Sequence, residues 1–270
     1  MEQIAADRAR PRIARAARSA WHIDVLLALT AADLRARYGR GPIRMLRWLV
    51  DPFALVGVYL LLVTFIVNRP GFAPGLSLAC AVVPFQLVMS TVMNAMSAVT
   101  ARRSIILNMA FPRTLLPISS ALTESVGFIA SFSLFVIMMA AYQITPTVNV
   151  LWLPILVVTS TIFAAAIAFP SLLFGLWFRE LRPFALSFVR TLFFLGSGLV
   201  PLAATHGNVD TTLRLNPLTA IFESFRQALL FGKPPHAWQI FYPLLLAAAT
   251  IAIFYPLYAR EQRQFAKVVE

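Results

Sequence analysis

Six long apolar stretches constrain this chain more than any other feature of its sequence. A helix that crosses the hydrocarbon of a bilayer needs about 20 mainly apolar residues. Stretches of this kind occupy residues 49–67, 76–99, 115–142, 150–178, 183–204 and 238–258. Only 13% of the 270 residues are charged and 59% are apolar, whereas a soluble domain needs a more highly charged surface. The sequence therefore predicts an all-α membrane protein with six transmembrane helices.

The basic residues are distributed unevenly around these stretches. Ten of the 23 Lys and Arg residues precede residue 49. If the N-terminus is cytoplasmic, eighteen basic residues flank the spans on the inside and four on the outside, namely Arg69, Arg214, Arg226 and Lys233. Membrane proteins accumulate basic residues on their cytoplasmic side. We therefore predict that both termini are cytoplasmic, and that the net charge of +12 reflects topology rather than nucleic-acid binding.

The segment before the first span divides into two parts. Residues 1–20 are rich in arginine and are expected to form a flexible leader. Residues 21–48 are expected to form a helix and a linker. In the helical part, residues 21–38, apolar side chains recur on one face, at Ile23, Leu27, Ala31, Leu34 and Tyr38. This pattern predicts an amphipathic helix at the inner membrane surface, or a cytoplasmic helix packed on a partner protein. Residues 49–258 would form the transmembrane domain and residues 259–270 a cytoplasmic tail.

No motif for an energy source or for catalysis occurs in the sequence. A phosphate-binding loop needs a lysine behind glycines at fixed spacing, and neither Lys233 nor Lys267 lies in such a loop. The three histidines are scattered without metal-ligand spacing, and there is no nucleophile elbow of a hydrolase. We therefore expect neither a catalytic site nor a metal or cofactor in this chain, so that any ATP-driven activity requires a partner.

Two charged residues lie well inside the predicted spans, Glu124 in the third and Arg190 in the fifth. Ion-coupled carriers place ionisable groups in the membrane, so Glu124 is either a coupling acid or a carboxylate that bonds a neighbouring helix. Arg190 is long enough to reach the headgroups, and a contact with Glu124 is a further prediction. Two charges are few for ion coupling. Two classes stay open as alternatives to a protein driven by an ATP-hydrolysing partner. One is an ion-coupled carrier or lipid flippase, and the other is a membrane transferase acting on lipid-linked sugars.

Short motifs follow one another in a recognisable order along the chain. They are DLRARYGRGP (33–42), FPRTLLP (111–117), FRELR (178–182), LNPLTAIFESFR (215–226) and QFAKVV (264–269). Together they resemble the membrane (permease) subunits of ABC-2 type polysaccharide exporters, which export O-antigen, teichoic acid or capsule. The resemblance covers about residues 30–268.

The resemblance implies a subunit of the bacterial inner membrane that works as a dimer with a separate P-loop ATPase. ATP and Mg would bind to that partner rather than to this chain. The implied substrate is a lipid-diphosphate-linked glycan, moved from the cytoplasmic side across the membrane.

For such a subunit, we hypothesise roles for particular residues on the cytoplasmic side. Residues 104–116 would couple to the ATPase, with contacts at Ile105, Asn108, Phe111, Pro112 and Arg113. Arg102, Arg103 and Arg113 are equally well explained as anchors for anionic headgroups. The substrate-entry arginines would be Arg35, Arg37, Arg40 and Arg44, which are also typical of an ordinary positive-inside flank.

Two further sets of residues are predicted in the channel and outside it. Aromatic faces guide sugars, and the candidates that line the channel are Tyr59, Phe193 and Phe194. Residues 217–231 are apolar but too short to span, which predicts a re-entrant or interfacial helix before the last span. The resemblance places the external gate there, with Asn216, Pro217, Glu223 and Arg226 as its residues. Glu223 and Arg226 are three residues apart, so a local ion pair is the alternative.

Overall fold

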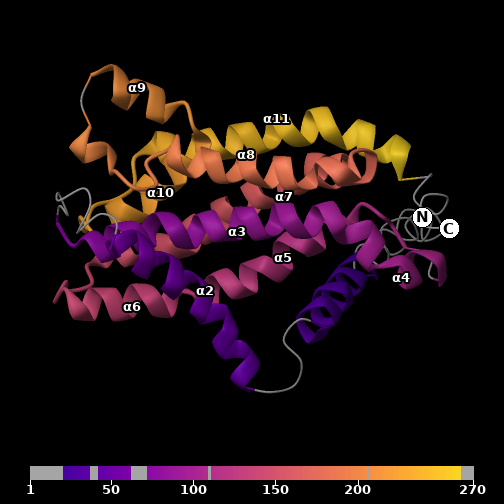
Figure 1. Cartoon of the computed structure of the whole chain (residues 1–270), viewed down its shortest axis with the longest axis horizontal. Coiled ribbons are helices and arrows are strands. Elements are labelled where there is room, and N and C mark those ends of the chain that lie inside the picture. Colours follow the sequence, from indigo (N-terminus) through magenta and orange to yellow (C-terminus); the bar gives the residue numbers. More distant parts are fainter. Residues whose placement is uncertain (1–20, 37–41, 62–71, 109–110, 206, 263–270) are drawn as a thin grey trace, which may run out of the picture.

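The computed structural model describes residues 21–36, 42–61, 72–108, 111–205 and 207–262. Within these ranges every regular element is a helix and there is no strand, which confirms the all-α prediction. The predicted leader, residues 1–20, lies outside the described residues, as does most of the predicted tail. Figure 1 shows the longer helices running side by side along the long axis of the molecule.

The helices follow one another with short connections. An N-terminal helix over residues 21–36 comes first. The others are α2 (Pro42–Leu61), α3 (Pro74–Ala101), α4 (Arg103–Asn108), α5 (Leu115–Ala130), α6 (Phe132–Ala141), α7 (Leu153–Trp177), α8 (Arg182–Phe194), α9 (Asn208–Arg214), α10 (Pro217–Leu229) and α11 (Ala237–Glu261). Short 3₁₀ turns lie between some of them, at η2 (Val148–Trp152), η3 (Arg179–Leu181) and η4 (Leu202–Ala204).

Four helical segments are long and apolar enough to cross a bilayer. They are α3, the α5–α6 pair, η2 with α7, and α11, which correspond to the second, third, fourth and sixth predicted spans. The α5–α6 pair counts as one span because only Ser131 separates the two helices. The amide and the hydroxyl of Ser131 both donate to the carbonyl of Gly127, at 2.9 Å each, so the helical course continues through this position.

The two remaining predicted spans correspond to shorter helices. The fifth was expected to run to residue 204, but α8 has 13 residues and ends at Phe194. This corrects the predicted boundary: a turn containing Gly196 and Gly198 follows, and its carbonyls bond to another helix instead of continuing α8. The described apolar part of α2 covers Pro52–Leu61. The total of six spans therefore stays a prediction.

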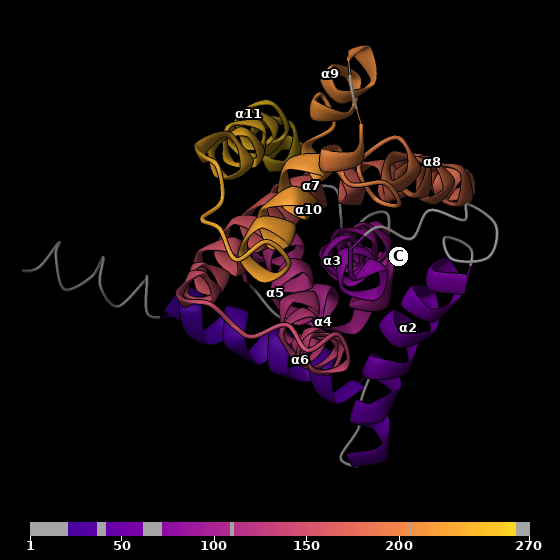
Figure 2. The same cartoon turned by 90° about the vertical axis from the view of Figure 1, so that its left-hand side faces the viewer.

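α3 forms the centre of the bundle. Its side chains are buried without interruption from Leu76 to Val83, and it packs against α2, α5, α7 and α10. Figure 2 looks along the helices and shows α3 between α2, α5 and α10. Small residues such as Ala79 and Ala81 on α3 let the neighbouring backbones approach closely, which is how helices associate where no hydrophobic effect drives them together.

α7 crosses α3 at Gly175. A β-carbon at this position would lie 2.3 Å from the carbonyl oxygen of Met96 and 2.6 Å from its Cα. Backbone atoms cannot move aside as a flexible side chain can, so any larger residue at Gly175 must push the two helices apart.

We predict that Gly175→Ala lowers the free energy of unfolding by about 1–3 kcal/mol, the usual cost of overpacking a tight core. Thermal unfolding of the detergent-purified protein measures this loss. Gly57→Ala is the matched control, because a β-carbon at Gly57 in α2 meets no atom within 4 Å. Equal unfolding temperatures for the two variants would contradict the close packing of α3 on α7.

The described segments gather at two ends of the bundle (Figure 1). One end, which we call the basic end, holds the N-terminal helix, α4, η3 and the last turn of α11. There the Tyr258 hydroxyl donates to the carbonyl of Arg113 (2.6 Å). The other end, which we call the α10 end, holds α9, α10 and η2. There the Asn149 side chain donates to the carbonyl of Gly232 (2.7 Å). The two groups match the segments predicted to lie inside and outside.

The N-terminal helix uses two different faces. Ile23 and Leu27, from its predicted apolar face, are 57% and 58% exposed, whereas Leu29 is buried against the bundle. Asp33 forms an ion pair with Arg102, whose side chain is buried, and this pair ties the helix to the end of α3. Ile23 and Leu27 are therefore left exposed for a membrane surface or a partner protein, whereas Ala31 and Leu34 on the same face are half-buried. Both alternatives stay predictions.

Candidate functional site

α10 covers one end of the bundle and carries the predicted gate residues. Pro217 opens the helix, and Asn216 caps it by accepting a hydrogen bond from the backbone amide two residues further on (3.0 Å). The Asn216 side chain also donates to the carbonyl of Leu192 in α8 (2.6 Å). Glu223 and Arg226 lie further along the helix and are 2% and 0% exposed. The four residues therefore share one short helix whose charged side chains are buried.

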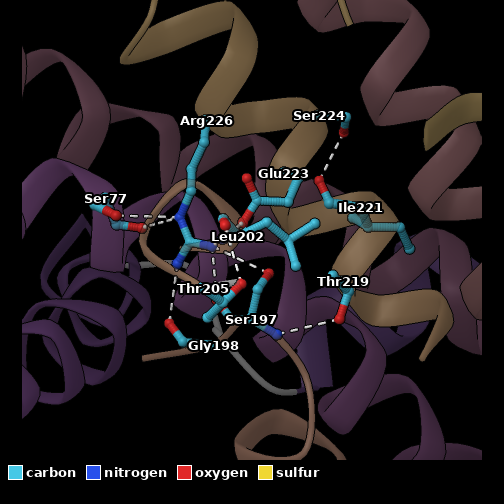
Figure 3. A network of polar contacts seen from close by, with 10 residues as sticks. All are labelled: Ser77, Ser197, Gly198, Leu202, Thr205, Thr219, Ile221, Glu223, Ser224 and Arg226. Atoms are coloured by element: carbon cyan, nitrogen blue, oxygen red, sulfur yellow. Dashed lines mark hydrogen bonds and ion pairs between the residues drawn. The ribbon is translucent and has the colours of Figure 1, made fainter. Parts of the chain in front are cut away.

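Arg226 is the centre of a buried polar network, shown in Figure 3. Its Nη1 donates to Glu223 Oε1 and to the carbonyl of Ser197, both at 2.6 Å. Its Nε donates to the carbonyl and the hydroxyl of Ser77 (3.1 Å each), and its Nη2 donates to the carbonyl of Gly198 (3.1 Å). We call these five residues the Arg226 network. A buried charge is costly unless it is paired and hydrogen-bonded, and here the guanidinium is both.

Glu223 extends the network to η4. Its Oε1 also accepts a hydrogen bond from the amide of Leu202 (3.1 Å), and the amide of Ser197 donates to Thr219 Oγ1 of α10 (3.1 Å). α10 thus holds together the start of α3, the turn after α8, and η4. The local ion pair predicted between Glu223 and Arg226 is present, and it forms part of this longer-range connection.

Three members of the Arg226 network, Ser77, Ser197 and Gly198, do not stand out in the sequence. Ser77 is an ordinary small residue in an apolar stretch, and its role depends on where α10 packs. The sequence signal for this turn is the pair of glycines on either side of Ser197, because glycine within a helical pattern weakens the prediction of a continuous helix. A β-carbon at Gly198 would lie 2.4 Å from the carbonyl oxygen of Phe193, so the turn accommodates only glycine there.

The three candidate channel aromatics lie together between α2 and α8. Tyr59 stacks on Phe193 with ring centroids 5.5 Å apart, and it meets Phe194 edge-on at 6.2 Å. Phe193 is 1% exposed and also contacts Phe85 of α3 (4.8 Å), so it packs within the chain. Phe194 is 53% exposed and Tyr59 is half-buried. These two rings are the accessible ones, and their place in a channel stays a prediction.

α3, whose Phe85 contacts Phe193, also carries a polar face. The average hydropathy of this segment does not reveal that face. It consists of four half-buried residues at helical spacing, Gln86, Ser90, Asn94 and Ser97. The Asn94 side chain donates to Glu124 Oε1 of α5. Glu124 therefore bonds a neighbouring helix, which is one of its two predicted roles. Arg190 is exposed on α8, and its predicted contact with Glu124 stays a prediction.

The predicted coupling segment lies at the basic end, beside the last turn of α11. In α4, Ile105 is half-buried and Asn108 is exposed. An open cavity of about 400 Å³ is lined by Phe111, Pro112, Arg113 and Gln262. The Arg113 side chain donates to the carbonyl of Gln262, which fixes the position of this loop. Three of the five predicted contacts therefore share one concave surface.

The predicted entry arginines are only partly within the described residues. Arg35 is exposed on the N-terminal helix. Arg37 and Arg40 lie outside the described residues, and Arg44 is described only as backbone of α2. Nearby, Arg102 is 7% exposed and paired with Asp33, so its charge is compensated within the chain. No cluster of three His, Cys, Asp or Glu suited to a metal ion occurs in the part of the chain that the structure describes.

Three relatives match most of the chain. It is 23% identical over 237 residues to the "O-antigen export system permease protein RfbA" of Klebsiella pneumoniae, an alignment that covers 86% of this chain and 91% of that protein. A second K. pneumoniae protein of the same name is 24% identical over 212 residues, which is 77% of this chain and 81% of the relative. The protein of that name from Myxococcus xanthus is 24% identical over 252 residues, or 91% and 95%. Along most of its length, the chain is therefore similar to O-antigen export permeases.

This similarity confirms the resemblance to polysaccharide-exporter permeases predicted from the short motifs. No family model matches the chain. The alignments that cover 86% and 91% of this chain are long enough to include both the Arg226 network and the coupling segment. With its apolar helices, the chain is a multi-pass membrane protein.

Proposed function

We propose that this chain is the transmembrane subunit of an ATP-driven exporter that moves a lipid-linked polysaccharide out of the cytoplasm. The match to O-antigen export permeases along most of the chain carries this proposal. The sequence has no phosphate-binding loop, so a separate P-loop ATPase would bind ATP and Mg and supply the energy. In the transport cycle, this chain would form the path for the glycan and would move in response to the ATPase.

In this proposal the basic end faces the cytoplasm and the α10 end faces outside. The excess of basic residues on one side of the predicted spans supports that orientation. The cavity lined by Phe111, Pro112 and Arg113 would receive the ATPase, and closure of the ATPase would move the helices as rigid bodies. Arg35, with Arg37, Arg40 and Arg44, would contact the diphosphate of the substrate through charge-assisted hydrogen bonds.

Two copies of the chain would enclose the path between them. α8 is about 20 Å long at 1.5 Å per residue, which is shorter than the hydrocarbon thickness of about 30 Å. It exposes Phe184, Phe188 and Phe194, at 72%, 64% and 53%. A second copy would cover this face and place Tyr59 and the polar face of α3 along a shared conduit. The Arg226 network would then close the conduit on the outside until the ATPase moves the helices.

Deletion of the gene tests the proposal in the source bacterium. We expect long-chain polysaccharide to disappear from the cell surface while lipid-linked glycan accumulates inside, and plasmid-borne wild-type chain to restore the surface polysaccharide. A tagged chain, extracted in mild detergent, is expected to co-purify with a soluble P-loop ATPase. A deletion strain that keeps normal surface polysaccharide would contradict the proposed substrate.

A further inference from the structure

A second cavity lies at the α10 end, between α9, α10 and the start of α11. Its volume is about 440 Å³, which is within the range of about 300–1,000 Å³ that is typical of small-molecule sites. The side chains that define it, besides the start of η4, are Arg214, Glu223, Gln227, His236, Trp238 and Gln239. We call it the α10 cavity. Of the residues that line this cavity, only Glu223 is a predicted gate residue, and the others take no part in the proposed gate.

Polar groups with unused bonding capacity line the α10 cavity. Both hydrogen bonds of the Glu223 carboxylate are made by Oε1, which leaves Oε2 without a partner in the described structure. Gln239 accepts the amide of His236 at its Oε1 (2.9 Å), and its side-chain NH₂ has no acceptor among the described residues. Glu223 and Gln239 are each 2% exposed. Neither Glu223 Oε2 nor the Gln239 NH₂ is enclosed by protein, because the buried side-chain atoms that lack a partner among the described residues are Thr91 Oγ1 and Arg102 Nη1. Both groups are therefore free to bond a polar ligand in the cavity.

An aromatic ring completes the wall of the cavity. The Arg214 guanidinium lies over the indole of Trp238, 5.2 Å from the ring centroid, and Asp210 holds that arginine at 2.9 Å. His236 caps α11 in a capping box with Gln239, so the backbone beside the indole is fixed. A rigid indole next to carboxylate, amide and guanidinium groups matches a ligand that has both C–H faces and hydroxyl groups.

We propose that the α10 cavity binds one sugar residue of the exported glycan on the external side; this rests on the proposed function. A pyranose presents C–H groups to the indole and hydroxyls to Glu223 Oε2 and the side-chain amides of Gln227 and Gln239. A phosphate is disfavoured, because the Glu223 carboxylate lies in the wall. Glu223 also belongs to the Arg226 network, so a bound sugar and Arg226 would share the Glu223 carboxylate.

The test uses the full-length chain in lipid nanodiscs, with Trp238 as its one tryptophan and the other four replaced by phenylalanine. The probe is O-polysaccharide from the source bacterium, released from its lipid by mild acid. We expect a saturable change in Trp238 fluorescence. Gln227→Ala, which removes a side chain without hydrogen bonds in the described structure, is expected to raise the half-saturating concentration about three- to tenfold. Gln143→Ala, an exposed glutamine at the same end, is the control and should leave it unchanged.

Two outcomes would overturn the proposal: no saturable change, or the same half-saturating concentration for Gln227→Ala and for the unsubstituted chain. The deletion strain separates this result from the fate of the proposed function. If deletion abolishes surface polysaccharide while Gln227→Ala binds the probe normally, the sugar site alone is wrong. If deletion leaves surface polysaccharide intact, the proposed function itself fails.

Discussion

Arg226→Met is expected to destabilise the protein by about 3–5 kcal/mol, the usual cost of removing one partner from a buried ion pair. The substitution leaves Glu223 charged and buried at 2% exposure, and it removes the donor that satisfies the carbonyls of Ser77, Ser197 and Gly198. Thermal unfolding of the detergent-purified protein measures the loss, and we expect less of the variant in membranes.

Two further variants distinguish the charge from the hydrogen bonds. Adding Glu223→Gln to Arg226→Met removes the unpaired charge and keeps an acceptor for the Leu202 amide, so it should recover part of the lost stability. Arg214→Met is the control. It breaks an i,i+4 pair with Asp210 in which the arginine is 48% exposed, and should cost less than about 1 kcal/mol. A loss no larger for Arg226→Met than for Arg214→Met would show that the network does not hold α10 in place.

Replacing Phe111, Pro112 and Arg113 together by alanine is expected to weaken binding of the partner ATPase at least about thirtyfold, the effect of losing an interface hot spot. Export of polysaccharide should fall in parallel. The helical bundle should survive, because Tyr258 bonds to the backbone carbonyl at position 113, whereas the lost bond from the Arg113 side chain to the Gln262 carbonyl fixes only the loop. Co-purification of the ATPase and surface polysaccharide are the two measurements.

Arg260→Ala is the matched control for the triple variant. Arg260 is exposed near the end of α11, so the substitution removes one positive charge from the same end without touching the concave surface. We expect normal ATPase binding and export from it. If the triple variant assembles with the ATPase and exports polysaccharide as the control does, the loop has no coupling role, and its arginines only anchor headgroups.

The sequence predicts α3, α7 and α11 well because each is a long apolar segment, and length alone identifies a spanning helix. It also predicts that Glu223 and Arg226 share a helical face, because their spacing is a local property. The family resemblance draws on short motifs in order, which likewise need no knowledge of packing.

Features that depend on packing are not predictable in this way. α8 ends at Phe194 because the following carbonyls bond to Arg226, whose side chain comes from a helix more than 20 residues later. Leu29 interrupts the amphipathic pattern of the N-terminal helix because it packs on the bundle, opposite to the face that the pattern identified. The α10 cavity combines α9, α10 and α11, and no single motif contains its residues.

We propose above that this chain exports a lipid-linked polysaccharide with energy from a separate ATPase. Inverted membrane vesicles that contain the chain and its co-purified ATPase test it directly, with radiolabelled lipid-linked glycan supplied outside. We predict that labelled glycan becomes protected inside the vesicles only when ATP is hydrolysed, and that an ionophore leaves the rate unchanged. Uptake that proceeds without ATP and stops when the ionophore dissipates the ion gradient would contradict the account and identify an ion-coupled carrier.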